Sequence, residues 1–475
     1  MRLSLFAAAA LGLAPGLATA NELLNVYQLA VAHDTQIAAA GYARDAALES
    51  RPQARAALLP LINGSYTYSK GRSKGESSQS SETSVDADQD GEPDDVEAPF
   101  GEPDLIPITL SRTFDTNDTN RNLSINLNQP IFDWAAFQRY SRSADELALA
   151  QATYRSAEQD LMLRASRAYF DYLAANDDLR YTGAQKASLE RQLEQAKKRF
   201  EVGLSAVTDV QEAQASYDIV LADVIAADQR LAASREALLE VTGQQDARLV
   251  PLQEEIPLPG PQPENVDAWL ASARENNFDL AIARINATLA GRDVSIARAG
   301  HYPTLGLVGQ YTDSDADSKE RSSDTGDVSQ QSKGPSIGLQ LNVPIFSGFL
   351  VQSQTRQALS VEQQRQAEAA GRLRSVSRQT RDAYLAVLSG SARVRALKQA
   401  VISNQTALQA SETGLEVGTR TTVDVLNAQS LLYSAQRDYS RARYDYLIAI
   451  LTLKSASGRL AQNDLKEIDQ LLING

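Results

Sequence analysis

The chain has 475 residues, no cysteine and a formal net charge of −14 at pH 7. Without cysteine it has no disulfide bonds and no lipid-modified N-terminal cysteine. The acidic balance argues against nucleic acid as a partner, because the negative excess repels phosphates.

Residues 1–20 are typical of a secretory signal peptide. Arg2 gives a positive start, Leu3–Leu17 is apolar, and Ala18–Ala20 ends the segment with small residues. The alternative is an N-terminal anchor helix, but Pro15 and Gly16 interrupt a stretch that is too short to span a membrane. We therefore predict cleavage after residue 20, and no later segment approaches the ~20 apolar residues of a spanning helix.

The sequence contains two copies of one unit. Asn128–Asp133 returns as Asn342–Ser347 at an offset of 214 residues, and Phe200–Gly203 returns as Leu415–Gly418 at an offset of 215. Three further pairs recur at an offset of 215: Thr208–Val210 with Val423–Val425, Ala213–Gln214 with Ala428–Gln429, and Thr242–Gly243 with Ser457–Gly458. These matches predict a first repeat over 21–250, a linker over 251–265, a second repeat over 266–460 and a C-terminal tail over 461–475.

Each repeat has the same predicted order of elements. An alanine-rich helix comes first, over about Asn21–Leu58 and again over Val266–Ala299. A strand pair with a polar loop follows, and then a very long helical stretch. Between the repeats, Pro251–Pro263 contains five prolines in thirteen residues, which excludes regular structure there.

Four segments alternate apolar and polar residues with the period of a half-buried strand. They are Ile62–Ser69, Leu123–Asn128, Leu305–Thr312 and Ser336–Val343. Such alternation also fits a soluble sandwich. Small uncharged residues on the polar faces favour a membrane sheet around a wet lumen, as do aromatic residues at the ends that join the helices: Phe132, Trp134, Phe137, Tyr302, Phe346 and Phe349. Because four strands cannot close a barrel, strands of this kind that span a membrane require several subunits, each of which contributes a sector.

The predicted helical stretches are very long. Trp134–Arg199 has no proline, and its only glycine is Gly183. A helix of this length extends roughly 100 Å. A turn near Gly203 starts a return helix through Val241. Helices this long form coiled coils or the staves of a helical barrel.

The turn sequences resemble those of one known family. Gly418–Leu426 is similar to the second-repeat turn of the TolC family, and Phe200–Gly203 followed by Thr208–Gln211 is similar to its first-repeat turn. Arg443–Leu447 and the strand exits at Pro130 and Pro344 match as well. The resemblance covers nearly the whole mature chain, in order and with both repeats.

This resemblance implies a mixed fold. A homotrimer has twelve strands, four from each chain, that form one outer-membrane β-barrel continuous with a long periplasmic α-helical barrel. A mixed equatorial region holds the linker and the tail. The implied function is an exit duct in the cell outer membrane for tripartite efflux or type I protein secretion, which conducts drugs, small molecules or unfolded proteins.

The resemblance also implies the partners. These are a periplasmic adaptor protein, an inner-membrane pump of the RND, ABC or MFS type, and outer-membrane lipid. We expect no enzymatic activity and no required cofactor, since the sequence contains no phosphate-binding glycine loop and no catalytic constellation. The only two histidines, His33 and His301, lie near helix ends and are interpreted as structural.

The resemblance places a gate at the two turns, which carry Gly203 and Gly418. Three copies of Asp424 would form a ring of negative charge around the axis, and such rings select cations. A second acidic ring of the family falls on Asn427, and a tyrosine of its gate falls on Leu415. This chain therefore lacks one charged ring and one of the side chains that help to close the gate in the family.

Three polar residues match those that link the turns in the closed gate. They are Thr208, Asp209 and Arg420. An arginine can lock a carboxylate with two hydrogen bonds, although an exposed pair contributes little. The alternative interpretation is that Asp209 and Arg420 are ordinary solvated charges at helix ends.

An acidic segment lies between the first two predicted strands. Gly75–Ser111 contains eleven Asp or Glu residues and no Lys or Arg. Within it, a calcium-loop pattern is complete: Asp86, Asp88, Asp90, Gly91 and Glu97. Alternating carboxylates can converge on a hard cation, and the glycine permits the sharp turn. The pattern indicates a Ca²⁺ site in an extracellular loop; the alternative is a solvated loop whose charges repel one another.

Two other functions fit parts of the sequence. A passive diffusion porin with a periplasmic helical stalk would explain the strands, but it has no use for helices of roughly 100 Å. A soluble periplasmic coiled-coil adaptor would explain the helices, but it leaves the strands without a purpose. The export duct explains both.

Overall fold

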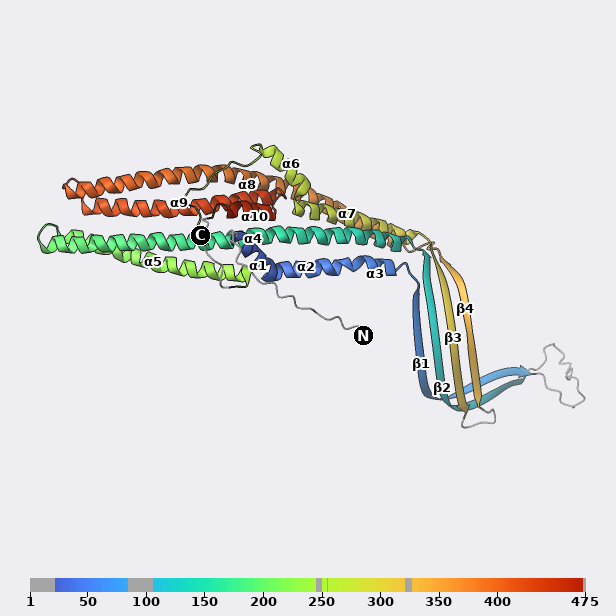
Figure 1. Ribbon diagram of the computed structural model, residues 1–475. Helices are drawn as coiled ribbons and strands as arrows, with labels where there is room; N and C mark the ends of the chain where they lie inside the picture. The colour runs from blue at the N-terminus through green and yellow to red at the C-terminus, as the bar shows by residue number, and fades with distance from the viewer. Residues whose placement is uncertain (1–21, 84–105, 245–249, 254, 321–326, 473–475) are drawn as a thin grey trace, which may run out of the picture. The chain divides into compact units, whose positions relative to one another are not determined.

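The computed structural model describes residues 22–83, 106–244, 250–253, 255–320 and 327–472. These residues divide into two compact units (Figure 1). The helical unit contains the described residues of Met1–Arg51, Arg142–Val294 and Arg356–Gly475. The second unit contains those of Pro52–Ser141 and Ser295–Thr355, including a β-sheet.

The helices follow the predicted order in both halves of the chain. The first half has α1 (Glu22–His33), α2 (Thr35–Leu48), α3 (Ser50–Ala56), α4 (Trp134–Glu201) and α5 (Val207–Thr242). The second half has α6 (Val266–Asn276), α7 (Phe278–Arg298), the 3-10 helix η1 (Ala299–His301), α8 (Leu350–Glu416), α9 (Thr422–Ala456) and α10 (Gln462–Asp469). Within the described residues, no helix is both long and apolar enough to cross a membrane.

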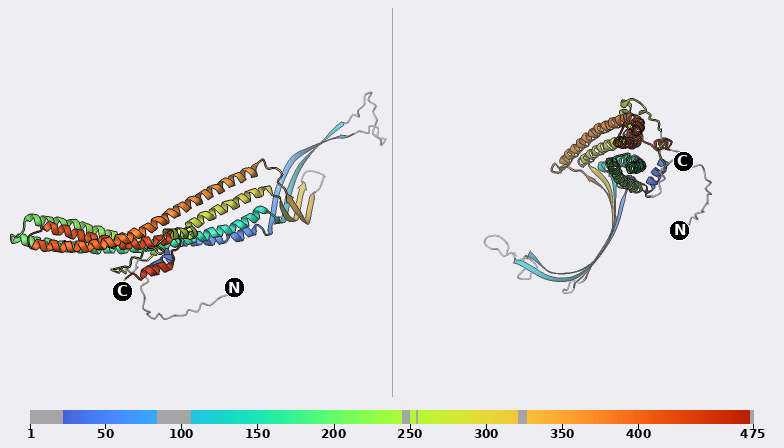
Figure 2. Two further views of the ribbon diagram at one scale, coloured as in Figure 1. Left: turned by 90° about the horizontal axis from the view of Figure 1, so that it is seen from above. Right: turned by 90° about the vertical axis from the view of Figure 1, so that its left-hand side faces the viewer.

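Two long helical hairpins dominate the helical unit. α4 and α5 form one hairpin and α8 and α9 the other, and their members run side by side (Figures 1 and 2). The outgoing helices have 68 and 67 residues and the returning helices 36 and 35. The predicted helix from Trp134 is therefore present as one continuous element.

The alanine-rich helix at the start of each repeat is broken, although the sequence predicted a continuous one. Asp34 has an extended backbone, and its carboxylate accepts hydrogen bonds from the N–H groups of Gln36 and Ile37, both at 2.9 Å. Asn277 is likewise extended, and it caps the first turn of α7 with a 3.0 Å hydrogen bond. A side chain that caps a new helix competes with continuation of the old one.

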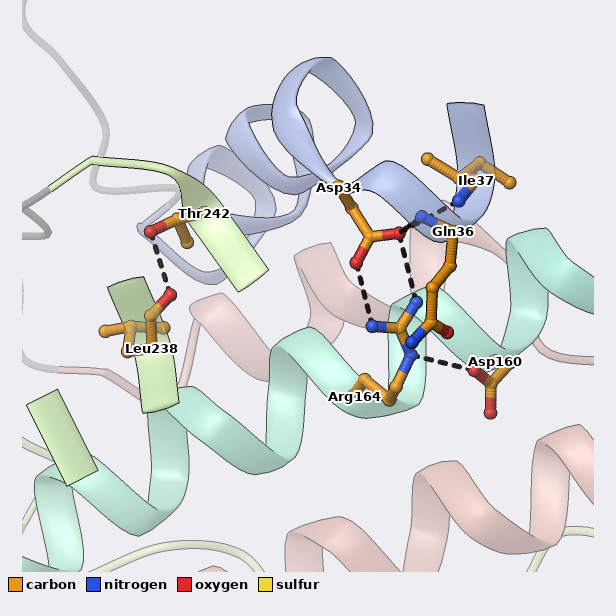
Figure 3. Close-up of polar contacts among 7 residues, drawn as sticks. All are labelled: Asp34, Gln36, Ile37, Asp160, Arg164, Leu238 and Thr242. Carbon is orange, nitrogen blue, oxygen red and sulfur yellow. Dashed lines mark hydrogen bonds and ion pairs between the residues drawn. The ribbon is translucent and has the colours of Figure 1, made fainter. Parts of the chain in front are cut away.

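Asp34 also anchors the break between α1 and α2 to α4. Its carboxylate, in a residue only 5% exposed, accepts hydrogen bonds from Arg164 at 2.8 and 3.2 Å (Figure 3). Arg164 Nε donates to Asp160 at 2.8 Å. Burial raises the pKa of Asp34, but the hydrogen bonds from Arg164 and from the α2 amides outweigh burial and lower the pKa overall.

His33 packs against the end of α5, which supports its structural interpretation. Gly243 follows that helix with a φ of 67°, and a Cβ at this glycine would lie 2.7 Å from the Cβ of His33. The hydroxyl of the preceding Thr242 donates to Leu238 O at 2.9 Å (Figure 3). The histidine therefore fills the space that the glycine leaves.

The core of the helical unit joins α1, α4 and α9. Tyr169, Phe170 and Tyr444 are at most 1% exposed, and successive ring centroids lie 5.7 and 5.9 Å apart. Leu23 and Leu447 belong to the same cluster. Each such side chain contributes roughly 2–3 kcal/mol on burial. This cluster therefore ties the start of the chain to both hairpins.

The proline-rich linker is held through its carbonyl oxygens. Proline has no backbone N–H, so the linker offers mainly acceptors, and the neighbouring helices supply the donors. The Arg443 side chain donates to the carbonyl oxygen of Gln253 at 2.9 Å, and the Trp269 indole donates to that of Pro263 at 2.8 Å. The Tyr446 hydroxyl donates to the carbonyl oxygen of Pro259. In its described residues the linker forms only an isolated bridge, as its prolines predicted.

That bridge brings the linker to the C-terminal tail, since it joins Leu252 to Leu472. The tail also reaches the start of the chain. Asp469 of α10 accepts hydrogen bonds from the N–H groups of Leu23 and Leu24, at 2.7 and 3.1 Å. The linker, the tail and α1 therefore form one region of the helical unit.

The sheet contains four antiparallel strands in chain order. They are β1 (Leu61–Thr83), β2 (Ile106–Phe132), β3 (Thr304–Glu320) and β4 (Val328–Asn342). Figure 2 shows that the sheet is curved. All four predicted strands are present, and each is longer than the alternating segment that predicted it.

The extra length corrects the extent of the acidic loop. β1 and β2 remain paired as far as Thr83 and Ile106, so both ends of the predicted loop are strand. The pairing of β2 with β3 stops at Thr116 and Glu320, and the β1–β2 ribbon extends farther (Figure 1). The residues of β1 there are polar on both faces, whereas β2 has apolar residues at alternate positions from Ile106 to Leu110, so backbone pairing continues although β1 has no alternating pattern.

Candidate functional site

The two long hairpins end in turns of the same geometry. Gly203 and Gly418 have φ angles of 75° and 81°, in the left-handed region where a side chain is disfavoured. In each turn a backbone N–H returns to the carbonyl five residues earlier, as in a Schellman motif. These hydrogen bonds join Leu204 to Arg199 and Thr419 to Gly414, both at 2.8 Å.

The second turn enters α9 through a capping box. Thr421 Oγ1 accepts a hydrogen bond from the Asp424 N–H at 3.2 Å. The Asp424 carboxylate accepts from the Thr421 N–H at 2.8 Å and from its hydroxyl at 2.9 Å. These contacts, the backbone N–H first, lower the pKa of Asp424, and Arg420 at 4.0 Å adds to the effect. The carboxylate is therefore ionised at neutral pH.

The first turn lacks this box. Ala206 precedes α5 at the position that matches Thr421, and its side chain cannot cap the helix. Asp209 matches Asp424 in the repeat, yet its carboxylate makes no hydrogen bond or ion pair within the part of the chain that the structure describes. One aspartate is thus used inside its own turn, and the other is left for another contact.

The predicted link between the turns is not formed within one chain. In the described ranges Arg420 makes its ion pair with Asp424, and neither Thr208 nor Asp209 bonds to it. Arg420 also packs over Gly414, since a Cβ at that glycine would lie 2.6 Å from its side chain. A link through Thr208 and Asp209 remains a prediction for the assembled protein.

The hairpins meet just inside the turns. Leu426 of α9 packs in a buried cluster with Leu189 of α4 and Val220 of α5. Leu415 is half-buried and lines an open pocket beside α4, whereas Asn427 is exposed. Leu426 therefore holds the start of α9, and with it the predicted ring residue, against the first hairpin.

The predicted calcium ligands Asp86, Asp88, Asp90 and Glu97 lie outside the described residues. In the part of the chain that is described, no group of three or more His, Cys, Asp or Glu side chains could hold a metal ion. The calcium loop therefore stays a prediction.

Sequence reasoning missed Thr421. The signal was present, because a threonine three residues before an acidic residue at a helix start is the pattern of a capping box. Asp424 therefore has two roles, a charge proposed for the ring and hydrogen bonds that cap α9.

Paired long hairpins with glycine turns, joined to a sheet with one apolar face, define a class of protein, the channels of the bacterial outer membrane. The chain belongs to the Outer membrane efflux protein family, whose sequence model matches residues 26–244 and 269–459. The predicted family and location in the outer membrane are confirmed.

Named relatives support this assignment. The chain is 35% identical to outer membrane protein TolC of Vibrio cholerae, over 98% of this chain and 97% of that protein. It is 31% identical to the alkaline protease secretion protein AprF of Pseudomonas aeruginosa, over 95% and 88%. The outer membrane channel CmeC of Campylobacter jejuni has the same fold, with a TM-score of 0.72 at 16% identity over 95% of this chain and 90% of that one.

The chain is thus an outer-membrane exit duct, as the resemblance implied. Its family is one of channels and not of enzymes. The division into two repeats and a linker stays a prediction.

Proposed function

We propose that three copies of this chain form one closed duct, with a twelve-stranded barrel in the outer membrane. The four-stranded sheet carries this proposal, because β1 and β4 are its end strands and each leaves one edge without a partner among the described residues. An open edge in lipid strands backbone groups without hydrogen bonds, and closure into a barrel removes it. Three sheets of four strands give an even-numbered barrel of ordinary size.

The hairpins extend this duct into the periplasm, where it meets a periplasmic adaptor and an inner-membrane pump of the RND, ABC or MFS type. The pump supplies the energy. Relatives named for protease secretion and for efflux, AprF and the outer membrane efflux protein BepC of Brucella suis, support a duct that serves both routes. The substrates are drugs, other small molecules or unfolded proteins.

The gate lies at the turns of the two hairpins. Three ionised Asp424 carboxylates form a ring that attracts cations. Arg420 of one turn engages Thr208 and Asp209 of another, for which the unoccupied Asp209 carboxylate is suited. Opening separates these contacts, which are exposed and individually weak.

The proposal is tested on protein purified in detergent. Native mass spectrometry should give the mass of three chains, and planar-bilayer recordings should show low resting conductance. Crosslinking should capture an adaptor at the turns. A large resting conductance without any adaptor complex would instead indicate a diffusion porin. Extraction without detergent would indicate a soluble adaptor.

A further inference from the structure

The sheet has two chemically different faces. Strand pairing places the even-numbered residues of β1 and the odd-numbered residues of β2, β3 and β4 on one side, named face A, and the others on face B. Near the helices, one row of face A contains Ile62, Leu127 and Ile337. Face B is mainly polar there, apart from Leu61 and Val308, and the hydroxyls of Ser65 and Ser124 lie 2.8 Å apart. A membrane barrel turns its apolar face to lipid, so face A faces lipid.

Six of the seven basic residues of the four strands lie on face A, beyond the apolar rows, and the seventh, Arg112, is placed on face B by the strand register. The six on face A are Lys70, Arg72, Lys74, Arg121, Lys319 and Lys333. Carboxylates lie on the same face, at Asp115, Asp313, Asp315 and Asp317, so the cations available to a ligand are those that these carboxylates leave unpaired.

On β1 the cations directly follow an aromatic boundary. Tyr68 is 56% exposed on face A, and the next three positions of that face are Lys70, Arg72 and Lys74. Each step of two residues covers about 7 Å along the strand. Aromatic girdles mark the boundary between hydrocarbon and headgroups. The three cations therefore lie at headgroup depth, before the run ends at Glu76.

These cations outnumber the carboxylates that pair with them. Arg72 and Lys74 share a single carboxylate, Asp115, at 2.6 and 3.4 Å. Lys70 makes no ion pair among the side chains that the structure describes. Arg121, the cross-strand partner of Tyr68, is 53% exposed and lies 3.5 Å from an aspartate of β3. Donors therefore remain for an anion.

We propose that Lys70, Arg72 and Lys74, together with Arg121, bind the phosphate groups of a phosphorylated lipid of the outer leaflet. The acyl chains of this lipid lie along the apolar rows of face A. Ammonium and guanidinium groups form strong charge-assisted hydrogen bonds to phosphate. A free phosphate would gain only the cations, whereas a lipid gains the cations and the apolar rows. The inference rests on the outer-membrane barrel proposed above.

The test compares the full-length protein with a triple variant, Lys70→Gln, Arg72→Gln and Lys74→Gln. Detergent-purified protein is titrated with diphosphoryl lipid A, and bound lipid is counted by native mass spectrometry. Each basic residue near anionic headgroups contributes several-fold in affinity, so the triple variant should bind about 100-fold more weakly at low salt. The loss should shrink at high salt. Equal affinity of the variant and the parent protein would overturn the proposal.

Further arms identify the source of the phosphate and exclude misfolding. Dephosphorylated lipid A should bind weakly to the parent protein. Inorganic phosphate should not displace the bound lipid. Displacement of the lipid at similar phosphate concentrations would indicate a simple anion site and overturn the proposal. Matched substitutions in α8, Arg374→Gln, Arg378→Gln and Arg381→Gln, should leave lipid binding unchanged. An equal loss in both triple variants would also contradict it. The lipid-free spectrum tests the trimer independently, because a parent protein of another mass refutes the proposed assembly whatever the lipid does.

Discussion

Arg164 holds Asp34 by two hydrogen bonds, at 2.8 and 3.2 Å, at the point where the first helix of the chain breaks. The same carboxylate caps α2 through two backbone N–H groups. One buried side chain therefore caps α2 at the break after α1 and also fixes that break to α4, the 68-residue helix beside it.

Replacing Asp34 should destabilise the helical unit. Asp34→Ala removes the cap and the ion pair and should cost about 2 kcal/mol. Thermal unfolding in detergent measures the loss. Asp45→Ala is the matched control, because Asp45 forms an exposed pair with Arg44 and should change stability little. Equal shifts in both variants would show that the break does not depend on this contact.

The contribution of Asp34 should depend on pH. Its pKa in the folded protein is lowered, so the stability it adds is present above the ordinary pKa near 4 and is lost as pH falls through the lowered value. Asp34→Asn keeps a capping oxygen and removes the charge. The difference in melting temperature between this variant and the parent protein should be largest at neutral pH and should disappear as the pH falls through the lowered pKa. A gap that widens in acid would contradict the assignment.

The Asp424 ring should control block by cations. Asp424→Ala should weaken block of the closed pore by multivalent cations, but it also breaks the capping box. Asp424→Asn is the sharper variant, because it removes the charge and keeps an acceptor for Thr421. Asn427→Asp should act in the opposite direction by adding a second ring. Planar-bilayer recordings measure both effects, and unchanged block in both variants would refute the ring.

Arg420→Ser should raise the resting conductance, because it removes the proposed contact with Thr208 and Asp209. The variant also removes the 4.0 Å pair with Asp424 in the same turn. Asp209→Asn separates the two effects, since it affects only the contact with another turn. Conductance that stays at the parental level in both variants would mean that packing alone closes the turns. Leu415, which stands where the family has a tyrosine, favours that outcome.

Calcium should protect the acidic loop. If Asp86, Asp88, Asp90 and Glu97 bind one ion, millimolar calcium should slow proteolysis of the loop, because the bound ion holds these side chains together and orders the loop. Asp88→Asn and Asp90→Asn together should abolish that protection. Cleavage at the same rate in calcium and in chelator would leave a solvated acidic loop.

The sequence predicted the strands where apolar and polar residues alternate, and it failed where the alternation ends. Ile62 and Tyr66 alternate with polar residues on β1, but beyond Ser69 both faces of β1 are polar while pairing continues to Thr83. The break at Asp34 was missed because the surrounding segment is rich in alanine, and this composition was given more weight than the single capping residue.

The candidate site was predicted only in part, for a different reason. Gly203 and Gly418 stand at the turns because their φ angles require glycine, which is a local property of the chain. The partner of Arg420 is not local. It depends on which turns meet in the assembly, and the sequence of a single chain does not specify that contact.

The two outgoing helices differ by one residue, 68 against 67, which is about 1.5 Å of helix. If turns from both hairpins must close one opening, a turn displaced along the axis would leave a gap that no side chain spans. We therefore expect insertions and deletions to be coupled between positions more than two hundred residues apart. A change of length in one hairpin would then be viable only with the same change in the other, so the reach of the duct would vary as a single inherited trait.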